Sequence, residues 1–361
     1  MTNLPRVGQA TVALMALTAA APAPRPVSAY LGGRAVQQAD GSLSIGWPGA
    51  YLEGRFTGTA VRVRFQTSTD HLRLLIDGEE KRRFDHPGPD PVDAVVGGLR
   101  PGTHVVRLEK LTESQEGGFR FIGFYTAADA KPLPPRPRAR QIEFIGDSYT
   151  VGYGNTSPTA TCTRQEIHDT TDSQRAFGPL VARRFDADYR LNAYSGFGIV
   201  RNYNGTSPTR SLPIIYPQLK PDDATHLDPG DPKWRPQLLV VNLGTNDFST
   251  DLHAGEQWPD LPALQTAYRQ RYVSFLTELH AKQPQARVIL MGKPQFYDQV
   301  AQVSTAVNAR FPGWTTPVRF DGLAYSGCNA HPSMADDRIL AELLVGTINK
   351  FPLGWRAAPA R

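Results

Sequence analysis

The sequence has few cysteines, no long internal apolar run and no detectable repeat. No internal run reaches the ~18 apolar residues that a transmembrane helix needs, and nothing recurs at the period of a solenoid. Of the 361 residues, 40% are hydrophobic and 20% are charged, so the chain can bury a sizeable core. These features exclude a membrane-spanning protein, a coiled coil and a collagen, and we expect no membrane partner.

The net charge of +5 lies almost entirely in two short segments. Residues 1–29 contain two basic residues and no acidic one, and residues 131–140 contain four basic residues. In contrast, residues 30–130 have 12 basic and 13 acidic residues, and residues 141–361 have 21 of each. A surface that follows a phosphate backbone needs a basic excess on a folded domain. The charge distribution therefore argues against a nucleic-acid partner.

Residues 1–29 have the layout of a secretory signal peptide. Arg6 precedes a mostly apolar stretch, and small residues follow up to a candidate cleavage site before Tyr30. A disordered terminus rich in alanine and proline is the alternative. Export predicts a secreted or periplasmic protein, in which the only two cysteines, Cys162 and Cys328, can form a disulfide. Two free buried thiols are the alternative for these residues.

Residues 30–130 alternate apolar and polar residues in short segments that Gly and Pro clusters separate. Examples are AVRVRFQT at residues 60–67, LRLLIDG at residues 72–78 and THVVRLEKLT at residues 103–112. This period of two predicts an all-β, jelly-roll-like antiparallel sandwich. Such a domain is either a carbohydrate-binding module or a packing partner, and its sequence shows no site of its own.

Residues 131–140, KPLPPRPRAR, predict a stiff linker because they are rich in proline. Residues 141–355 then alternate short apolar strands with helical stretches. IEFIG at residues 142–146 predicts a strand, and the apolar positions between residues 261 and 279 predict a helix. This alternation predicts an α/β domain with a mostly parallel sheet, in which reactive groups gather beyond the carboxyl ends of the strands.

Four polar motifs follow the predicted strands or precede the last predicted helix. They are GDS at residues 146–148, SGFG at residues 195–198, GTND at residues 244–247 and HP at residues 331–332. A serine hydroxyl can attack an ester carbonyl when a histidine takes its proton, which suggests Ser148 as nucleophile and His331 as base. The backbone N–H groups of Ser148 and Gly196 and the side-chain amide of Asn246 can hold the developing oxyanion. The motifs together predict acyl transfer.

The four motifs, in this order, resemble those of the SGNH (GDSL-like) hydrolase superfamily, whose marker residues fall on Ser148, Gly196, Asn246 and His331. The signatures IEFIGDSYTVGYGN, SGFGIVRNY and GCNAHPS, with HVVRLEKLTES and GFRFIGFY near the N-terminus, resemble carbohydrate esterase family two. The resemblance covers nearly the whole mature chain and implies a three-layer α/β hydrolase domain. It implies a secreted acetyl esterase that removes O-acetyl groups from plant polysaccharides such as xylan and glucomannan, with a preference for O-6-type positions.

The segment before His331 departs from the common superfamily pattern. An Asp usually stands three residues before the histidine and orients the imidazole, but this position is Cys328 here. The family includes members with a Ser–His dyad in which a backbone carbonyl orients the histidine, and this sequence is similar to those. Asp321, ten residues upstream, is the alternative orienting acid. We expect a Cys162–Cys328 disulfide to join the loop after the nucleophile to the loop that carries His331.

Other polar residues have simpler interpretations. Asp147 is expected to orient the nucleophile loop, and Asp247 to fix its own turn. Gly196 and Gly198 do not form a dinucleotide-binding turn because residue 201 is Arg, so no cofactor is predicted. The remaining histidines have no metal-ligand spacing, so no metal site is predicted. These histidines are His71, His86, His104, His168, His226, His253 and His280.

Two other functions remain open at this stage. One is a GDSL-type lipase or phospholipase, although the chain has no long apolar lid segment. The other is a carbohydrate-binding protein whose hydrolase fold has lost its activity. The presence of all four marker residues argues against such a loss, and an acetylated carbohydrate is the predicted partner.

Overall fold

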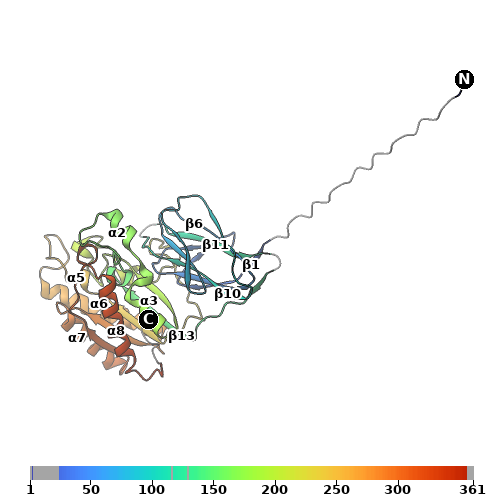
Figure 1. The fold of residues 1–361 in the computed structure, drawn as a ribbon. Helices are drawn as coiled ribbons and strands as arrows, with labels where there is room; N and C mark the ends of the chain where they lie inside the picture. Colours follow the sequence, from blue (N-terminus) through green and yellow to red (C-terminus); the bar gives the residue numbers. More distant parts are fainter. Residues whose placement is uncertain (1, 3–23, 115–116, 128–129, 356–361) are drawn as a thin grey trace.

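The computed structural model describes residue 2 and residues 24–114, 117–127 and 130–355. An N-terminal β domain and a C-terminal α/β domain pack side by side (Figure 1). Residues 1 and 3–23 of the predicted leader lie outside the described residues, so the leader stays a prediction, whereas the candidate cleavage site before Tyr30 lies among the described residues. Within the described residues, no helix has the length and apolarity that crossing a membrane requires.

The N-terminal domain is the predicted sandwich of antiparallel sheets. In the part of the chain that the structure describes, one sheet has the order β3-β4-β11-β6-β9 with β1 beside β11, and the other has the order β12-β5-β10-β7-β8 with β2 beside β5. Its strands are β1 (Arg25–Val27), β2 (Ala29–Gly32), β3 (Val36–Gln37), β4 (Leu43–Ile45), β5 (Tyr51–Thr57), β6 (Val61–Gln66), β7 (Leu72–Ile76), β8 (Glu79–Phe84), β9 (Val92–Val96), β10 (Thr103–Lys110), β11 (Phe119–Thr126) and β12 (Lys131–Leu133). In β6, Val61, Val63 and Phe65 are buried between the sheets, as the period of two predicts.

The sandwich is longer at both ends than the sequence predicts. Strand β1 pairs with β11 and buries Val27 in the sandwich core, although residues 25–27 lie within the predicted leader. Strand β12 pairs with β5, although it occupies the first three residues of the predicted linker, residues 131–140. Both strands contain a proline, which sheet edges tolerate because the missing N–H can face away from the partner strand. Because proline-rich segments indicate a leader or a linker, the sequence did not predict these two edge strands.

The C-terminal domain has three layers around a parallel sheet, as predicted. The sheet has the order β14-β13-β15-β16-β17, and each neighbouring pair is parallel. Its strands are β13 (Arg140–Gly146), β14 (Ala187–Ala193), β15 (Leu238–Asn242), β16 (Arg287–Gly292) and β17 (Thr315–Arg319). Between them lie α1 (Ser148–Val151), α2 (Arg164–Thr170), η1 (Ser173–Arg175), α3 (Phe177–Arg184), η2 (Tyr203–Gly205), α4 (Leu212–Ile215), α5 (Thr245–Phe248), α6 (Leu261–Lys282) and α7 (Tyr297–Arg310); η3 (Cys328–Ala330) and α8 (Met334–Ile348) follow the last strand.

The two faces of the parallel sheet pack into two separate hydrophobic cores. On one side, Phe144 of β13 packs with Phe177 of α3 and Leu344 of α8. On the other, Ile145 of β13 shares a core with Tyr272 of α6 and with residues of α7. This arrangement buries β13 on both faces and fixes the position of the residues that follow it.

The strand order places three of the four motifs together. Strand β13 is the switch point of the sheet: the next strand in the sequence, β14, lies on one side of it, and the following strand, β15, lies on the other. In open α/β sheets, ligands bind at such a switch point, beyond the carboxyl ends of the strands. GDS follows β13, SGFG follows β14 and GTND follows β15, so these three motifs meet at the same edge of the sheet.

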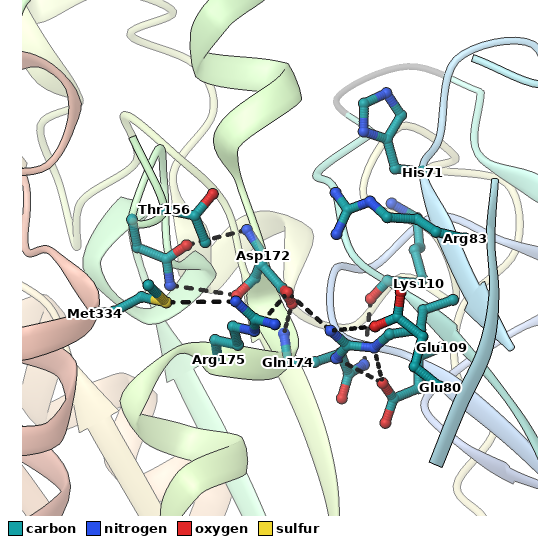
Figure 2. A network of polar contacts seen from close by, with 12 residues as sticks. His71, Glu80, Arg83, Glu109, Lys110, Thr156, Asp172, Gln174, Arg175 and Met334 are labelled. Atoms are coloured by element: carbon teal, nitrogen blue, oxygen red, sulfur yellow. Dashed lines mark hydrogen bonds and ion pairs between the residues drawn. The ribbon is translucent and has the colours of Figure 1, made fainter. Parts of the chain in front are cut away.

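A buried polar network joins the two domains (Figure 2). Arg73 of β7 donates to Glu109 of β10 at 2.8 and 2.9 Å, and its other amino group donates to Asp172 of the C-terminal domain at 3.1 Å. Asp172 also forms an ion pair with Arg175 at 3.3 Å, and Gln174 donates to the Gly49 carbonyl at 2.9 Å. Separating a buried charge from its partner strongly destabilises a protein. Because Arg73 and Asp172 belong to different domains, their pairing favours a single orientation of the domains.

Candidate active site

Ser148 is the first residue of α1 and follows β13 after a tight turn. Asp147 caps the helix by accepting a hydrogen bond from the Tyr149 N–H at 3.0 Å. Gly146 has no room for a side chain, because a Cβ there would lie 2.0 Å from Thr150 Oγ1. The turn holds Ser148 nearly buried, with 4% of its surface exposed. Asp147 therefore orients the nucleophile loop, as the sequence predicts, and burial raises its pKa to about 7.

The structure brings His331 against Ser148. The His331 Nε2 lies 2.9 Å from the Ser148 Oγ, and its Nδ1 lies 3.0 Å from the carbonyl oxygens of both Cys328 and Asn329. Because carbonyls only accept, Nδ1 carries the proton, and Nε2 is free to accept the serine proton. Burial lowers the pKa of His331, the two carbonyl contacts partly oppose this shift, and Lys293 lowers the pKa further. The lowered pKa favours the neutral imidazole, and the two carbonyl contacts direct its Nε2 toward Ser148.

The predicted disulfide is present and lies beside the histidine loop. Cys162 and Cys328 are bonded, with their Cα atoms 5.4 Å apart. The Asn329 N–H donates to the Ala160 carbonyl at 2.6 Å, and the Cys162 N–H donates to the Asn329 side-chain oxygen at 3.3 Å. Asn329 and Ala330 have φ of 50° and 58°, a region that non-glycine residues rarely adopt. The disulfide and these hydrogen bonds hold the two residues in that conformation.

Asp321, the alternative orienting acid, lies elsewhere. Its carboxylate forms an exposed ion pair with Arg319 at 3.3 Å, and 62% of its side chain is exposed. The His331 Nδ1 instead contacts the two carbonyls. The described contacts thus place backbone, and no carboxylate, at the position that an orienting acid occupies in a triad.

The two other predicted oxyanion donors lie on the neighbouring loops. Gly196 follows β14 with φ of 83°, which favours glycine. The Asn246 Nδ2 donates to the Phe197 carbonyl at 2.9 Å and lies 3.5 Å from an oxygen of Asp147. Asn246 therefore links the loops that follow β13, β14 and β15.

Asp247 acts over a longer range than the sequence predicts. Its buried carboxylate accepts from the backbone N–H groups of Ile199, Val200 and Arg201 at 2.9 to 3.1 Å. Burial raises its pKa to about 6, although these hydrogen bonds lower it. The expectation that Asp247 fixes only its own turn is therefore too narrow, since it also fixes the loop that follows Gly196.

Sequence reasoning missed several residues near the site, among them Lys293, whose charge lowers the pKa of His331. Glu113 follows β10 of the sandwich and accepts a hydrogen bond from the Ser195 N–H at 2.7 Å, so the N-terminal domain contacts the loop that carries Gly196. Tyr153 packs its ring against the His331 ring, with centroids 4.2 Å apart. Glu113 lies in the HVVRLEKLTES signature, but nothing in that pattern shows which residue it contacts.

The histidines are less scattered in space than in sequence. His71, His86 and His168 gather where the sandwich meets α2, with ring centroids 4.4 to 6.3 Å apart. His104 pairs with Asp77 at 2.7 Å in the sandwich, away from this cluster. Spacing along the chain could not reveal the cluster, because its members come from both domains.

Comparison with known proteins agrees with the fold and with the enzyme class that the motifs predict. The family model described as Carbohydrate esterase 2 N-terminal matches residues 31–136, and that of the GDSL-like Lipase/Acylhydrolase family matches residues 144–337. The chain is 46% identical over 336 residues to an acetylxylan esterase / glucomannan deacetylase of Cellvibrio japonicus (strain Ueda107), a match that covers 90% of this chain and 92% of that protein.

Solved structures extend the similarity to three dimensions. One is a carbohydrate esterase whose active site displays divergent catalytic and non-catalytic binding functions; it has a TM-score of 0.86 at 43% identity and covers 91% of this chain and 99% of its own. Another is a family two carbohydrate esterase from Clostridium thermocellum in complex with cellohexaose, with a TM-score of 0.77 at 28% identity over 89% of this chain and 98% of its own. The chain therefore belongs to carbohydrate esterase family two and is a carboxylic-ester hydrolase with a GDSL-like acylhydrolase domain.

Proposed function

We propose that the protein is a secreted esterase that removes O-acetyl groups from plant polysaccharides or oligosaccharides such as xylan and glucomannan. The observation that carries the proposal is the 2.9 Å contact between Ser148 Oγ and His331 Nε2, at the switch point of the sheet. The relative from Cellvibrio japonicus, an acetylxylan esterase / glucomannan deacetylase, supports this substrate class.

The proposed mechanism forms and then hydrolyses an acetyl-enzyme. His331 Nε2 takes the proton of Ser148 as the serine oxygen attacks the acetyl carbonyl. The resulting oxyanion accepts hydrogen bonds from the backbone N–H groups of Ser148 and Gly196 and from Asn246 Nδ2. The protonated His331 then gives its proton to the sugar oxygen as the bond between this oxygen and the acetyl carbon breaks. The products of this step are the free sugar hydroxyl and acetyl-Ser148.

The second half of the reaction uses the same groups. His331 takes a proton from a water molecule, the hydroxide attacks the acetyl carbonyl, and acetate leaves as Ser148 regains its proton. In this mechanism the catalytic unit is a Ser148–His331 dyad, and the carbonyls of Cys328 and Asn329 orient the imidazole. They accept the Nδ1 hydrogen bond but carry no full charge, so they replace only part of what a carboxylate does.

A preference for O-6-type acetyl groups is part of the proposal. Only 4% of the Ser148 surface is exposed, so the acetyl group must reach into the site. An acetyl on a primary O-6 stands one CH₂ farther from the sugar ring than an acetyl on a ring hydroxyl. The primary ester can therefore reach Ser148 while the sugar ring stays farther from the protein surface.

Export is also part of the proposal, and the disulfide supports it because disulfides persist in oxidising compartments. Cleavage before Tyr30 would remove β1, whose Val27 is 5% exposed in the sandwich core. We therefore place the cleavage upstream of Arg25. The N-terminal sequence of the exported protein tests this placement.

A substrate panel tests the function. Acetylated xylan, acetylated glucomannan and sugars acetylated only at O-6 or only at ring hydroxyls are compared with nitrophenyl esters of two to sixteen carbons. We expect acetate release from the polysaccharides, faster from O-6, and a steep fall of kcat/KM with acyl length. Faster turnover of long-chain esters would indicate a lipase, and carbohydrate binding without any turnover would indicate an inactive binding protein.

A further inference from the structure

A cluster of metal-ligand side chains lies at the junction of the two domains, apart from the catalytic residues. His71 directly precedes β7, His86 follows β8, and Asp169 belongs to α2 of the C-terminal domain. His71 lies beside the interdomain network on the sandwich side (Figure 2). Its side chain is 2% exposed, whereas those of His86 and Asp169 are 52% and 37% exposed. The cluster is therefore anchored inside and open to solvent on one side.

The donor atoms have the spacing of a tetrahedral metal site. His71 Nε2 lies 3.3 Å from His86 Nε2 and 3.6 Å from Asp169 Oδ1, and the latter two atoms are 2.8 Å apart. Around Zn²⁺, with bonds of about 2.0–2.1 Å, tetrahedral donors lie about 3.3 Å from one another. A circle through the three atoms has a radius of about 1.9 Å, so one ion can reach all three at the usual bond length.

Neighbouring groups support the three donors. Asp85 Oδ1 lies 3.2 Å from the other ring nitrogen of His71, in ion-pair range although the angle is not that of a hydrogen bond. A carboxylate in this position is the usual partner of a metal-bound histidine. Arg83 donates to both oxygens of Asp85 at 2.8 and 3.0 Å, and Gln165 donates to Asp169 at 2.9 Å. The carboxylates are thus held in place.

The helix that supplies Asp169 is also well anchored. Thr163, the residue before α2, caps the helix with a capping box, in which its hydroxyl accepts from the Glu166 N–H at 3.2 Å while its own N–H donates to Glu166 at 2.7 Å. The preceding residue is Cys162 of the disulfide. His168, on the same helix, donates to the Thr69 carbonyl of the sandwich at 2.9 Å. The position of Asp169 relative to His71 is therefore fixed on both sides.

We propose that His71, His86 and Asp169 form a binding site for Zn²⁺ or a similar divalent transition-metal ion, with water in the fourth position. Two imidazoles and a carboxylate suit such ions, whereas Ca²⁺ and Mg²⁺ prefer all-oxygen sites. The ion links β7 and β8 of the sandwich to α2 of the catalytic domain. Its role is to stabilise the junction of the domains, since it lies outside the reacting groups.

The first experiment measures metal binding to the untagged full chain after treatment with a chelator. Zn²⁺ is titrated calorimetrically into the wild type, and Ca²⁺ into a separate sample. We expect one Zn²⁺ per chain, no comparable Ca²⁺ binding, and a higher Tm with Zn²⁺ than without it. Absence of stoichiometric Zn²⁺ binding, or equal binding of Ca²⁺, would refute the site and leave a hydrogen-bonded His–His–Asp cluster.

Graded variants locate the ion. His86→Asn suits the backbone, because His86 has φ of 48° and Asn tolerates that region. We expect His86→Asn and Asp169→Asn to lower Zn²⁺ affinity at least about 100-fold, and Asp85→Asn by roughly 10–100-fold, the usual range for a supporting partner. Both ligand variants should also lose the rise of Tm with Zn²⁺.

The matched control removes another surface histidine that faces a carboxylate. His226 pairs with Asp223 at 2.7 Å, and neither belongs to the three-donor cluster found among the described residues. His226→Ala should keep the wild-type affinity for Zn²⁺. An equal loss in His226→Ala, or wild-type affinity in His86→Asn with a native circular-dichroism spectrum, would place the ion elsewhere and overturn the assignment.

Discussion

The two domains differ in how they contribute to the site. In the C-terminal domain, parallel strands end at the same edge, so Ser148, Gly196 and Asn246 follow three neighbouring strands and meet there. The sandwich has antiparallel strands, which send loops to both ends. None of the predicted catalytic residues belongs to it, and among its described residues Glu113 and His71 contact the other domain from outside the strands.

The comparison separates reacting groups from positioning groups. Glu113 acts on Ser195, one residue before Gly196, and Arg73 acts through Asp172 on the turn before α3. These sandwich residues contact the loops that follow the strands of the parallel sheet and help to fix their positions. Substitutions in the C-terminal loops should therefore cost much more activity than substitutions in the sandwich, and the predictions below test this division.

The largest effect is expected for Ser148→Ala. Without the nucleophile no acetyl-enzyme forms, so acetyl-ester hydrolysis should fall roughly 10³-fold or more, as in other triad knockouts. The variant should fold normally, because the Ser148 hydroxyl has its contact only with His331 among the described residues. The measurement is kcat/KM on an acetyl ester, with Tm as the control for folding. Substantial activity in a folded variant would remove Ser148 from the proposed role.

A somewhat smaller loss is expected for Asn246→Ala. Removal of one oxyanion donor typically lowers turnover ~10²–10³-fold, because the donor acts mainly on the charge of the transition state. The effect should appear in kcat more than in KM. Asn246 also donates to the Phe197 carbonyl, so Tm is measured alongside. A variant that changes only KM would contradict the oxyanion assignment.

Glu113→Ala tests the sandwich side of the comparison. Hydrogen bonds to charged groups contribute about 1.5–3 kcal/mol, so loss of the contact to Ser195 should lower kcat about tenfold or more by releasing the loop that carries Gly196. Glu113→Gln keeps an acceptor oxygen and should restore part of the loss. Glu79→Ala, which removes an exposed sandwich acid, is the control. A loss as large as that of Ser148→Ala would make Glu113 more than a positioning residue.

The fold was predictable where the signal is local. Alternation in segments such as AVRVRFQT indicates a sandwich strand because one face must be buried, and IEFIG indicates a parallel strand because both faces are. The disulfide was predictable because the chain contains only two cysteines. Strands β1 and β12 were missed because proline signals a leader or a linker unless the neighbouring strand is known.

The site was predictable to the extent that its residues directly follow strands. GDS, SGFG and GTND each stand at a strand end, so the α/β rule gathers them without knowledge of side chains. Glu113 and the His71–His86–Asp169 cluster depend on how two domains dock, and docking is set by buried pairs such as Arg73–Asp172 that no spacing shows. Sequence alone therefore predicts which residues gather at the strand ends better than it predicts which residues contact one another between the domains.

A pH profile tests the electrostatics of the base, with an effect smaller than any above. Burial and Lys293 lower the pKa of His331, and only the neutral imidazole accepts a proton, so kcat/KM should fall only below the usual ~6.5 of histidine. Lys293→Met removes a positive charge, which raises the pKa and moves the acid limb to higher pH. Lys293 also lowers the pKa of Asp147, so the pKa of Asp147 should rise in Lys293→Met as well.

The control for this profile is Lys233→Met. The backbone carbonyl of Lys233 accepts a hydrogen bond from the side chain of Gln141, which lies at the start of β13 and thus at the opposite end of the strand from Ser148. Its replacement should leave the acid limb in place. A limb that stays fixed in Lys293→Met would show that Lys293 does not act on the base.

The smallest effect is expected for Asp321→Asn, and it decides between a dyad and a triad. In a triad, the carboxylate fixes the imidazole tautomer and stabilises its charged form, and neutralising it costs about 10⁴ in kcat. Here both carbonyl contacts of His331 Nδ1 are 3.0 Å long, while Asp321 pairs with Arg319 in solvent. Exposed ion pairs contribute about 0–1 kcal/mol, so stability should also change little. We expect Asp321→Asn to lower kcat/KM at most a few-fold, because the backbone carbonyls already fix the imidazole tautomer. The control Arg319→Gln, which removes the partner of Asp321, should show an equal effect. A loss near 10⁴ in Asp321→Asn would instead indicate a full triad.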